Sequence, residues 1–348
     1  MRWNYAFNIF LKNEKKSHFN VSVFLSLSVV IAQKTTTYPT KFTVALDGSG
    51  DFKSIQEAIM AFRDHSQQRV ILFIKNGTYH EKVTIPANKP NLHLVGESRE
   101  GVVITNGDYS GKNYPNGQKD AVGKTQFSTY NSYTLLVDAP DIVLENLTIV
   151  NSAGRVGQAV ALHVEGDRFV CKNCTLLGNQ DTLYAAREGT RQFYVNCQIE
   201  GTTDYLFGKA IVVFQSCTLK SLSDSYITAA ATPDYQPFGF VFFDCKLTAD
   251  STAKKVFLGR PWRPACKTVF IRTEIGSHIL PIGWNNWGNP ANEKTVLYAE
   301  YQSTGEGANP SKRVAWSRQL SKKELRIYTL ENIFGTKEPI KNWWNREE

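Results

Sequence analysis

A short block of sequence recurs along the middle of this 348-residue chain. In each copy, apolar residues are followed by a polar residue, then Leu or Cys, then a polar and an aliphatic residue. The copies are VLENLTIVNS (143–152), VCKNCTLLGN (170–179), FYVNCQIEGT (193–202), VFQSCTLKSL (213–222) and FFDCKLTAD (242–250). Successive copies are 20 to 28 residues apart. An irregular period of this length without long helices is typical of a parallel β-helix, in which loops absorb the length differences between coils.

Two other architectures share part of this pattern. Leucine-rich repeats have similar periods, but they follow a stricter Leu/Asn pattern that is absent here. A β-sandwich would show hairpin turn signals rather than one recurring consensus. We therefore predict an all-β fold, a single-stranded parallel β-helix with long loops that form a cleft.

The residues before the repeats predict a cap for the first coil. FTVALDGSGDFKSIQEAIMAFRD (42–64) indicates a strand, a turn and an amphipathic helix. Ser54 and Glu57 have the spacing of a capping box at the start of this helix. The predicted buried face of the helix consists of Ile55, Ile59 and Phe62.

The repeat also predicts how the cysteines are arranged. Cys174, Cys197, Cys217 and Cys245 occupy one position of successive blocks, so we expect them to stack at about the strand spacing of ~4.8 Å. The favoured interpretation is a ladder of small buried apolar residues. A Cys197–Cys217 disulfide is the alternative, because neighbouring coils lie within disulfide range. The Cys171/Cys174 pair has no second pair at zinc-finger spacing, so no metal site is predicted.

The N-terminus is typical of an export signal. Lysines precede the stretch FNVSVFLSLSVVIAQ (19–33), whose apolar part is too short to span a bilayer comfortably. Small residues at 30–32 suit cleavage by signal peptidase. A buried strand or a membrane anchor is the alternative. The sequence predicts a signal peptide at 1–32, a linker at 33–41 and the β-helix domain at 42–348, with the mature protein secreted and disulfides permitted.

Charge and composition narrow the class of partner. The formal net charge of +8 favours an acidic partner, such as nucleic acid, anionic lipid or an acidic polysaccharide. No run of five or six Lys/Arg marks a nucleic-acid patch, and we expect none to be bound. A solvated basic surface without a specific partner is the alternative. The 15 Tyr, 20 Phe and 7 Trp residues either fill a core or provide platforms for sugar rings.

Three polar residues stand at equal spacing before apolar strands. Gln158 begins QAVAL, Asp181 begins DTLYA and Asp204 begins DYLFG, at intervals of 23 and 23 residues. Successive coils would place all three in register on one face, at about the ~4.8 Å coil rise. Two carboxylates that close do not both ionise easily, so one keeps a proton and the other serves as an anion. Solvated turn carboxylates are the alternative interpretation.

An arginine follows a later strand in VFLGRPWRP (256–264). The guanidinium of Arg260 has the geometry to hold an aspartate ionised through a bidentate pair. The alternative is a surface arginine before a turn fixed by proline.

Together with GTYHE (77–81), the motifs QAVAL (158–162), GNQDTLY (178–184), DYLFG (204–208) and LGRPW (258–262) resemble the pectinesterase (pectin methylesterase) family. The resemblance covers roughly residues 42 to 330. It implies a right-handed parallel β-helix that hydrolyses the methyl esters of galacturonate in pectin. The protein expected from it is a secreted monomer that uses no cofactor and has no contact with a membrane after signal cleavage.

The resemblance also implies roles for individual residues. Asp204 resembles the nucleophile that attacks the ester carbonyl, and Asp181 resembles the acid/base that protonates methanol and then activates water. Gln158 and Gln180 are similar to the donors that stabilise the oxyanion, and Arg260 to the group that orients Asp204. Further expected substrate contacts are Trp262, Ser128, Thr129, Tyr184 and Phe207, with Trp284 and Trp287 as candidates for the cleft walls. For the aromatic residues, core packing is the alternative.

One departure from the family pattern stands beside the predicted nucleophile. The family more often reads Asp-Phe-Ile-Phe-Gly-Asn where this chain has Asp204-Tyr205-Leu206-Phe207-Gly208-Lys209. Lys209 adds a charge there, and we expect it to influence the pattern of action or the pH preference.

Other activities remain as alternatives. A pectate lyase would need clustered acids for calcium and a base, and a polygalacturonase would need acids without the paired glutamines. A non-catalytic polysaccharide-binding β-helix would need no Asp/Asp/Arg set. A Ser-His-Asp esterase is disfavoured, because the chain has no G-x-S-x-G motif.

Overall fold

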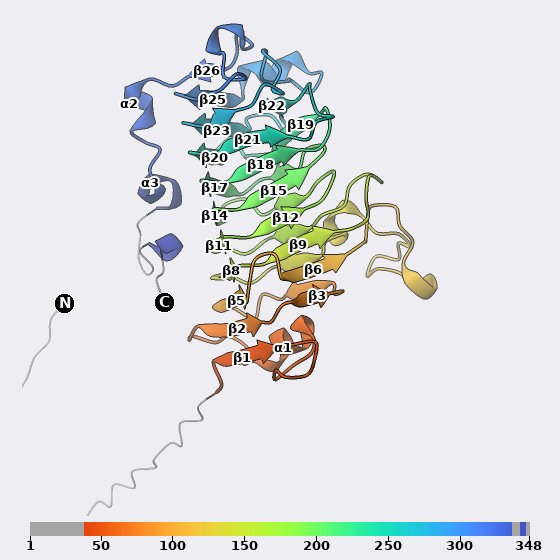
Figure 1. Ribbon diagram of the computed structural model, residues 1–348. Helices are drawn as coiled ribbons and strands as arrows, with labels where there is room; N and C mark the ends of the chain where they lie inside the picture. Colours follow the sequence, from red (N-terminus) through yellow and green to blue (C-terminus); the bar gives the residue numbers. More distant parts are fainter. Residues whose placement is uncertain (1–37, 336–341, 346–348) are drawn as a thin grey trace, which may run out of the picture. The chain divides into compact units, whose positions relative to one another are not determined.

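The computed structural model describes residues 38–335 and 342–345. The predicted signal peptide (1–32) and all of the predicted linker before Tyr38 lie outside these residues. The first strand begins at Lys41, next to the predicted start of the domain. From there the chain winds through a stack of coils, whose strands form three sheets (Figure 1).

The three sheets are parallel throughout. The eleven-stranded sheet contains β1 (Lys41–Val44), β2 (Val70–Ile74), β5 (Leu92–Gly96), β8 (Val143–Glu145), β11 (Phe169–Lys172), β14 (Arg191–Val195), β17 (Ile211–Gln215), β20 (Phe240–Phe243), β23 (Lys267–Ile271), β25 (Leu297–Tyr301) and β26 (Arg318–Gln319). The seven-stranded sheet contains β4 (Val83–Ile85), β7 (Leu135–Val137), β10 (Leu162–Val164), β13 (Leu183–Ala185), β16 (Leu206–Gly208), β19 (Tyr226–Ala230) and β22 (Phe257–Gly259). The eight-stranded sheet contains β3 (Gly77–Tyr79), β6 (Val102–Asn106), β9 (Thr148–Asn151), β12 (Thr175–Leu177), β15 (Gln198–Gly201), β18 (Thr218–Ser221), β21 (Lys246–Ala249) and β24 (Glu274–Ile275). The predicted parallel β-helix is confirmed.

The recurring sequence block is one corner of the coil, where the chain passes from the eleven-stranded to the eight-stranded sheet. One residue per coil adopts a left-handed backbone conformation there, which turns the chain sharply between two strands. Asn and Asp tolerate this conformation better than most residues, which explains the polar position in each block. The residues at this corner are Asn146, Asn173, Asn196, Ser216, Asp244, Arg272 and Gln302, with φ between 47° and 55°.

The cysteines lie immediately after this corner and point into the core. Thr175, Gln198, Thr218 and Lys246 pair in register, which places the preceding residues, Cys174, Cys197, Cys217 and Cys245, on successive coils. All six cysteines of the chain are buried and free. The predicted ladder of buried thiols is confirmed, and the alternative Cys197–Cys217 disulfide is not formed.

A helix closes the first coil, as predicted, but its cap differs in one respect. Helix α1 (Ile55–Ala61) buries Ile55 and Ile59, and Ser54 Oγ accepts a hydrogen bond from the Glu57 backbone N–H at 3.3 Å. The carboxylate on the helix N-terminus belongs to Glu81 rather than to Glu57. It accepts bonds from Ser54 Oγ and from the first backbone N–H groups of the helix at 2.8–3.0 Å. An anion is favoured there because the helix dipole presents positive charge.

The C-terminal segment covers the outer face of the eleven-stranded sheet. Helices α2 (Lys322–Leu325) and α3 (Leu330–Phe334) lie beside its strands in Figure 1. The 3-10 helix η5 (Trp343–Asn345) belongs to the same layer. Outward-facing residues of the sheet, such as Phe193 and Val213, form a second apolar cluster with Phe334 and Trp343. Within the described residues, none of the helices has the length and apolar character needed to cross a membrane.

Long loops leave the stack at the corner that precedes the seven-stranded sheet. The loop between β6 and β7 is the largest excursion in Figure 1 and contains η1 (Pro115–Gly117) and η2 (Thr129–Asn131). The loop between β24 and β25 contains η3 (Pro290–Lys294), and η4 (Pro310–Lys312) follows β25.

Candidate active site

The two predicted aspartates lie on neighbouring coils, in turns that lead into the seven-stranded sheet. Leu183 of β13 pairs with Leu206 of β16, so Asp181 and Asp204 occupy equivalent positions two residues earlier. Both have left-handed backbones, with φ of 67° and 47°. Both are buried, at 7% and 5% exposure. Uncommon backbone conformations at buried carboxylates are typical of functional positions. The predicted register of these two residues is confirmed.

Gln158 does not share this register, which corrects the prediction. It forms a parallel bridge with Gln180, the residue before Asp181. The strand that follows Gln158 pairs at an offset of 21 residues, Leu162 with Leu183, rather than 23. A bulge precedes this pairing, because the Thr182 carbonyl accepts bonds from both Ala161 N–H and Leu162 N–H at 2.9 and 3.2 Å. Two residues of one coil therefore oppose one residue of the next. The consequence is that the two predicted oxyanion donors, Gln158 and Gln180, lie side by side.

Arg260 holds Asp204 through two hydrogen bonds. Its Nε donates to Oδ1 at 3.0 Å and its Nη2 donates to Oδ2 at 2.6 Å. This fork-to-fork geometry fixes the plane of the carboxylate as well as its charge. Arg260 follows β22, whose neighbour in the sheet is β19, and its backbone N–H donates to Thr228 O at 2.9 Å. The predicted pair is therefore present, although it joins residues 56 positions apart.

The two carboxyl groups have different electrostatic environments. Burial, together with the nearby charge of Asp204, raises the pKa of Asp181 to about 8, and Arg260 opposes this only in part. Burial also raises the pKa of Asp204 above its ordinary value, although the hydrogen bonds and charge of Arg260 offset part of this rise. Arg260 therefore favours the anion at Asp204, while Asp181 keeps its proton at neutral pH. Such a split between paired carboxyls is a common sign of an acid and a base with separate roles.

Aromatic side chains form a row on the outer face of the seven-stranded sheet. The rings of Tyr184 and Phe207 are stacked at 4.4 Å, and Phe207 meets the half-buried Trp262 edge-on at 5.9 Å. Trp287 is 39% exposed and lies 3.8 Å from the guanidinium of Arg260. Trp284 is not a cleft residue: it is 1% exposed and stacks on Tyr298 at 4.2 Å in the core.

The glycine of the DYLFG motif has a steric explanation. Gly208 ends β16 with φ of 131°, and a Cβ there would lie 1.9 Å from the Ala185 carbonyl oxygen of the neighbouring coil. Only glycine fits so close to that strand. Lys209, the departure from the family pattern, is an exposed neighbour whose ammonium lies 3.6 Å from Glu188.

Ser128 and Thr129 lie at the start of η2 in the long loop. Ser128 is the N-cap residue of this short helix, and its backbone N–H and its hydroxyl both donate to Asn131 Oδ1, at 2.7 and 3.2 Å. The next residue, Tyr130, packs against Tyr184 at 5.6 Å. The loop thus borders the aromatic row, while the predicted contacts of Ser128 and Thr129 with substrate stay a prediction.

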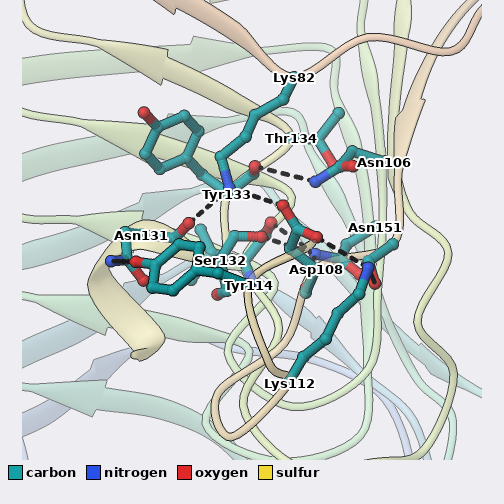
Figure 2. A network of polar contacts seen from close by, with 12 residues as sticks. Lys82, Asn106, Asp108, Lys112, Tyr114, Asn131, Ser132, Tyr133, Thr134 and Asn151 are labelled. Carbon is teal, nitrogen blue, oxygen red and sulfur yellow. Dashed lines mark hydrogen bonds and ion pairs between the residues drawn. The ribbon is translucent and has the colours of Figure 1, made fainter. Parts of the chain in front are cut away.

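A polar network anchors this loop to the coils (Figure 2). Lys82 pairs with Asp108 at 2.7 Å and donates to the Asn131 carbonyl at 2.6 Å. Asn151 Nδ2 donates to the carbonyls of Asp108, Ser132 and Val160 at 2.9 to 3.1 Å. Sequence reasoning missed this network, because its members are scattered and follow no local pattern.

The same loop reaches the segment that carries Gln158. The backbone N–H of Ser110 donates to the Gln158 carbonyl at 2.9 Å. Val160 N–H donates to Ser132 Oγ at 3.2 Å. Both ends of the segment are therefore held by the loop, which fixes the backbone from which Gln158 projects.

Fold and candidate site together define the class as a parallel β-helix protein with two buried aspartates on adjacent coils. The family model for Pectinesterase matches residues 41–337. Pectinesterase 31 of Arabidopsis thaliana is 34% identical over 279 residues, covering 80% of this chain and 86% of that protein. The chain belongs to the pectinesterase family, and the predicted family and enzyme class are confirmed.

Solved structures agree with this assignment. Pectin methylesterase from carrot has a TM-score of 0.76 and 32% identity, covering 87% of this chain and 95% of its own. A pectin methylesterase variant solved with a hexasaccharide has a TM-score of 0.73 and 31% identity, covering 88% and 99%. The right-handed parallel β-helix predicted from the family resemblance is therefore confirmed.

Proposed function

We propose that the protein hydrolyses methyl esters of galacturonate units in pectin by a two-aspartate mechanism, releasing methanol and de-esterified pectin. The observation that carries this proposal is the bidentate Arg260–Asp204 pair beside Asp181, whose pKa is raised to about 8. A nucleophilic carboxylate needs to be anionic, and an alkoxide leaving group needs a proton. The two environments supply these opposite requirements.

In the first half of the reaction, a carboxylate oxygen of Asp204 attacks the C6 carbonyl carbon of the ester. The tetrahedral intermediate collapses by breaking the bond between C6 and the methoxy oxygen. Asp181 transfers its proton to that oxygen, so methanol leaves and an anhydride joins Asp204 to C6. Arg260 holds the attacking carboxylate in one plane, which reduces the orientational freedom to be lost in the transition state.

In the second half, Asp181 is ionised and accepts a proton from water. The resulting hydroxide adds to C6, and the bond between C6 and the Asp204 oxygen breaks. The products are the free galacturonate carboxyl group, the Asp204 carboxylate and a reprotonated Asp181. Gln158 and Gln180 supply neutral amide donors for the oxyanion in both halves. Their bridge on adjacent coils supports a shared role.

The proposed substrate is supported by the aromatic residues beside the aspartates and by the net charge of the chain. The aromatic row beside the aspartates offers apolar faces for sugar rings, with Trp262 as the half-buried member. The formal charge of +8 suits an anionic polysaccharide. We include in the proposal that residues 1–32 direct export and that the mature protein acts outside the cell as a monomer.

The test is product identification. Mature protein incubated with methylated pectin without added calcium is expected to release methanol, measured enzymatically, with no change in chain length. Unsaturated products that absorb in the near ultraviolet would support a lyase, and new reducing ends would support a polygalacturonase. Asp204→Asn is expected to abolish methanol release with an unchanged circular dichroism spectrum. Normal release by that variant would refute the assigned nucleophile.

A further inference from the structure

Two aromatic rings pack on the guanidinium of Arg260. Cζ of Arg260 lies 4.0 Å from the ring centroid of Tyr226 and 3.8 Å from that of Trp287. We call these two residues the aromatic clamp. The in-plane N–H groups Nε and Nη2 are both used by Asp204, so the clamp contacts the parts of the group that the carboxylate leaves uncovered. Guanidinium groups are weakly hydrated and stack well on aromatic faces.

Tyr226 is connected to the nucleophile by two routes. Its backbone carbonyl accepts a hydrogen bond from Asp204 N–H at 2.8 Å, and its ring supports Arg260. The ring is itself supported from the next coil, because Tyr226 pairs in register with Phe257 and stacks on it at 5.1 Å and 18°. Phe257, Tyr226, Arg260 and Trp287 therefore form one continuous chain of stacking contacts from the sheet to the surface.

Trp287 completes this chain from a strained backbone. Its φ of 61° is left-handed, which is an outlier for a bulky residue. The conformation is stabilised by Asn285 Oδ1, which accepts from Trp287 N–H at 2.7 Å. Asn285 is tied to the site by its own N–H, which donates to the carbonyl of Gly259, the residue before Arg260. Strain of this kind persists where the surroundings enforce it and is a pointer to function.

We propose that Tyr226 and Trp287 are positioning residues for ester hydrolysis, which act by holding the guanidinium of Arg260 coplanar with the carboxylate of Asp204. The inference rests on the proposed function. It assigns the clamp no contact with the reacting atoms. The rings act because a flat support on the guanidinium restricts rotation about the Arg260 side chain and limits access of water to the pair.

The test compares Tyr226→Leu with Tyr226→Phe. Leucine removes the aromatic face, and kcat for methanol release is expected to fall roughly tenfold with KM unchanged, the size expected of a desolvated cation–π contact. Phenylalanine keeps the face and is expected to retain kcat within about twofold. A role of the phenolic hydroxyl alone would not give this split, because Tyr226→Phe removes that hydroxyl. The pH profile and the double mutant described next separate support of Arg260 from a loss of packing volume.

The dependence of kcat/KM on pH distinguishes a positioning role from general destabilisation of the fold, which would not shift the acidic limb. The titratable groups facing Asp204 in the described residues are Arg260, Asp181 and the buried phenol of Tyr298. Arg260 lowers the pKa of Asp204, so a loosened pair lets that pKa rise. The acidic limb of kcat/KM is therefore expected to move to higher pH in Tyr226→Leu and to stay in place in Tyr226→Phe.

A double mutant separates action through Arg260 from any other effect. In an Arg260→Gln background, Tyr226→Leu is expected to change kcat less than about twofold, because the clamped group is already gone. Phe243→Leu is the matched control, since Phe243 packs on Arg272, which forms a bidentate pair with Asp244 away from the site. It is expected to leave kcat unchanged.

Two results would overturn the inference: wild-type kcat in Tyr226→Leu, or a tenfold loss that persists in the Arg260→Gln background. If Tyr226→Leu does not fold, as judged by thermal melting, Trp287→Ala decides instead, because its ring is partly exposed. Wild-type kcat in Trp287→Ala would then overturn it. A wild-type protein that releases no methanol refutes the proposed function and this inference together, whereas an active wild type with unaffected variants refutes the inference alone.

Discussion

Asp204 and Asp244 have the same local construction in two different corners of the coil. Both have a left-handed backbone, with φ of 47° and 53°. Each donates its N–H to a carbonyl of the next coil, at 2.8 and 3.0 Å. Each accepts two hydrogen bonds from one arginine, Arg260 for Asp204 and Arg272 for Asp244. An aromatic ring lies near each guanidinium.

The difference between the two pairs is their surroundings. The side chains of Asp244 and Arg272 are 47% and 45% exposed, against 7% and 21% for Asp204 and Arg260. A second buried carboxyl, Asp181, influences the Asp204 pair alone. Exposed pairs contribute little because water screens them. The same bidentate Arg–Asp pair thus occurs at an exposed structural corner and at a buried one. The buried pair also lies beside a second carboxyl group, which suits it to the proposed reaction.

The largest predicted effect tests whether the Arg–Asp pair itself or its buried surroundings determine activity. Asp204→Asn is expected to lower kcat for methanol release by at least about 10⁴-fold, because an amide oxygen is a poor nucleophile. Asp244→Asn is expected to leave kcat within about twofold, since Asn occupies the same left-handed corner in three earlier coils, at Asn146, Asn173 and Asn196. Both are measured by initial rates on methylated pectin. Comparable losses in the two variants would contradict the distinction drawn between the pairs.

The next largest effect on activity is expected at Asp181, the proposed proton donor. Asp181→Asn removes the proton donor and is expected to lower kcat by about 10² to 10⁴, the usual range for general acid–base catalysis. The pKa of Asp181 is raised to about 8, so the protonated acid is lost as pH rises through that value. Wild-type activity should therefore fall on the alkaline side near pH 8. That limb should be missing from the residual activity of the variant, and its persistence would assign the titration to another group.

A smaller loss of activity is expected when the guanidinium of Arg260 is replaced by the ammonium of lysine. Arg260→Lys keeps the positive charge but cannot form two parallel hydrogen bonds, and kcat is expected to fall by roughly 10- to 100-fold. Because Arg260 lowers the pKa of Asp204, the acidic limb of kcat/KM should also move to higher pH. Arg272→Lys at the exposed pair is the control and should leave both quantities unchanged. An unchanged acidic limb in Arg260→Lys would show that the fork does not set the ionisation of Asp204.

Much of this site followed from the sequence because it depends on the repeat. The period predicts which residues stack, so the Asp181–Asp204 register follows once the strands are aligned. The motif around Arg260 predicts its pairing. Gln158 was placed wrongly, because the strand that follows it pairs at an offset of 21 residues, Leu162 with Leu183, rather than 23. A bulge opposite Thr182 then shifts Gln158 by one residue, so that it pairs with Gln180. The pattern of short strands alone carries no sign of such local irregularities.

Contacts between residues far apart in the sequence were also not predicted, and the reason is different. Glu81 replaces Glu57 at the start of α1, and it belongs to the connection between β3 and β4. Trp284 and Trp287 are three residues apart, yet one is buried in the core and the other is 39% exposed on Arg260. Their separation depends on the path of a long loop. Such features are set by tertiary packing, which overrides local composition.

The last prediction concerns stability rather than activity, and the expected change has opposite signs at the two sites. Asp181 has an ordinary pKa of 3.8 and a folded pKa of about 8, so the folded state binds the proton more tightly. This group therefore weakens the fold progressively as pH rises from about 4 to about 8. Asp181→Asn removes that penalty. It should raise the free energy of unfolding on the order of 5 kcal/mol at pH 8, because the folded and ordinary pKa values differ by about 4 and each pH unit of that difference corresponds to ~1.36 kcal/mol, with little change at pH 4.

At the exposed corner, Asp244→Asn is expected to lower the free energy of unfolding by less than about 1 kcal/mol, as for other surface ion pairs. Urea unfolding of both variants at pH 4 and pH 8 measures the comparison. Under the proposed mechanism, the buried acid lowers stability because its carboxyl is kept for chemistry, whereas the exposed pair adds a little stability and has no proposed role in the reaction. An Asp181→Asn protein that is no more stable than wild type at pH 8 would mean that the carboxyl is better solvated than its 7% exposure implies.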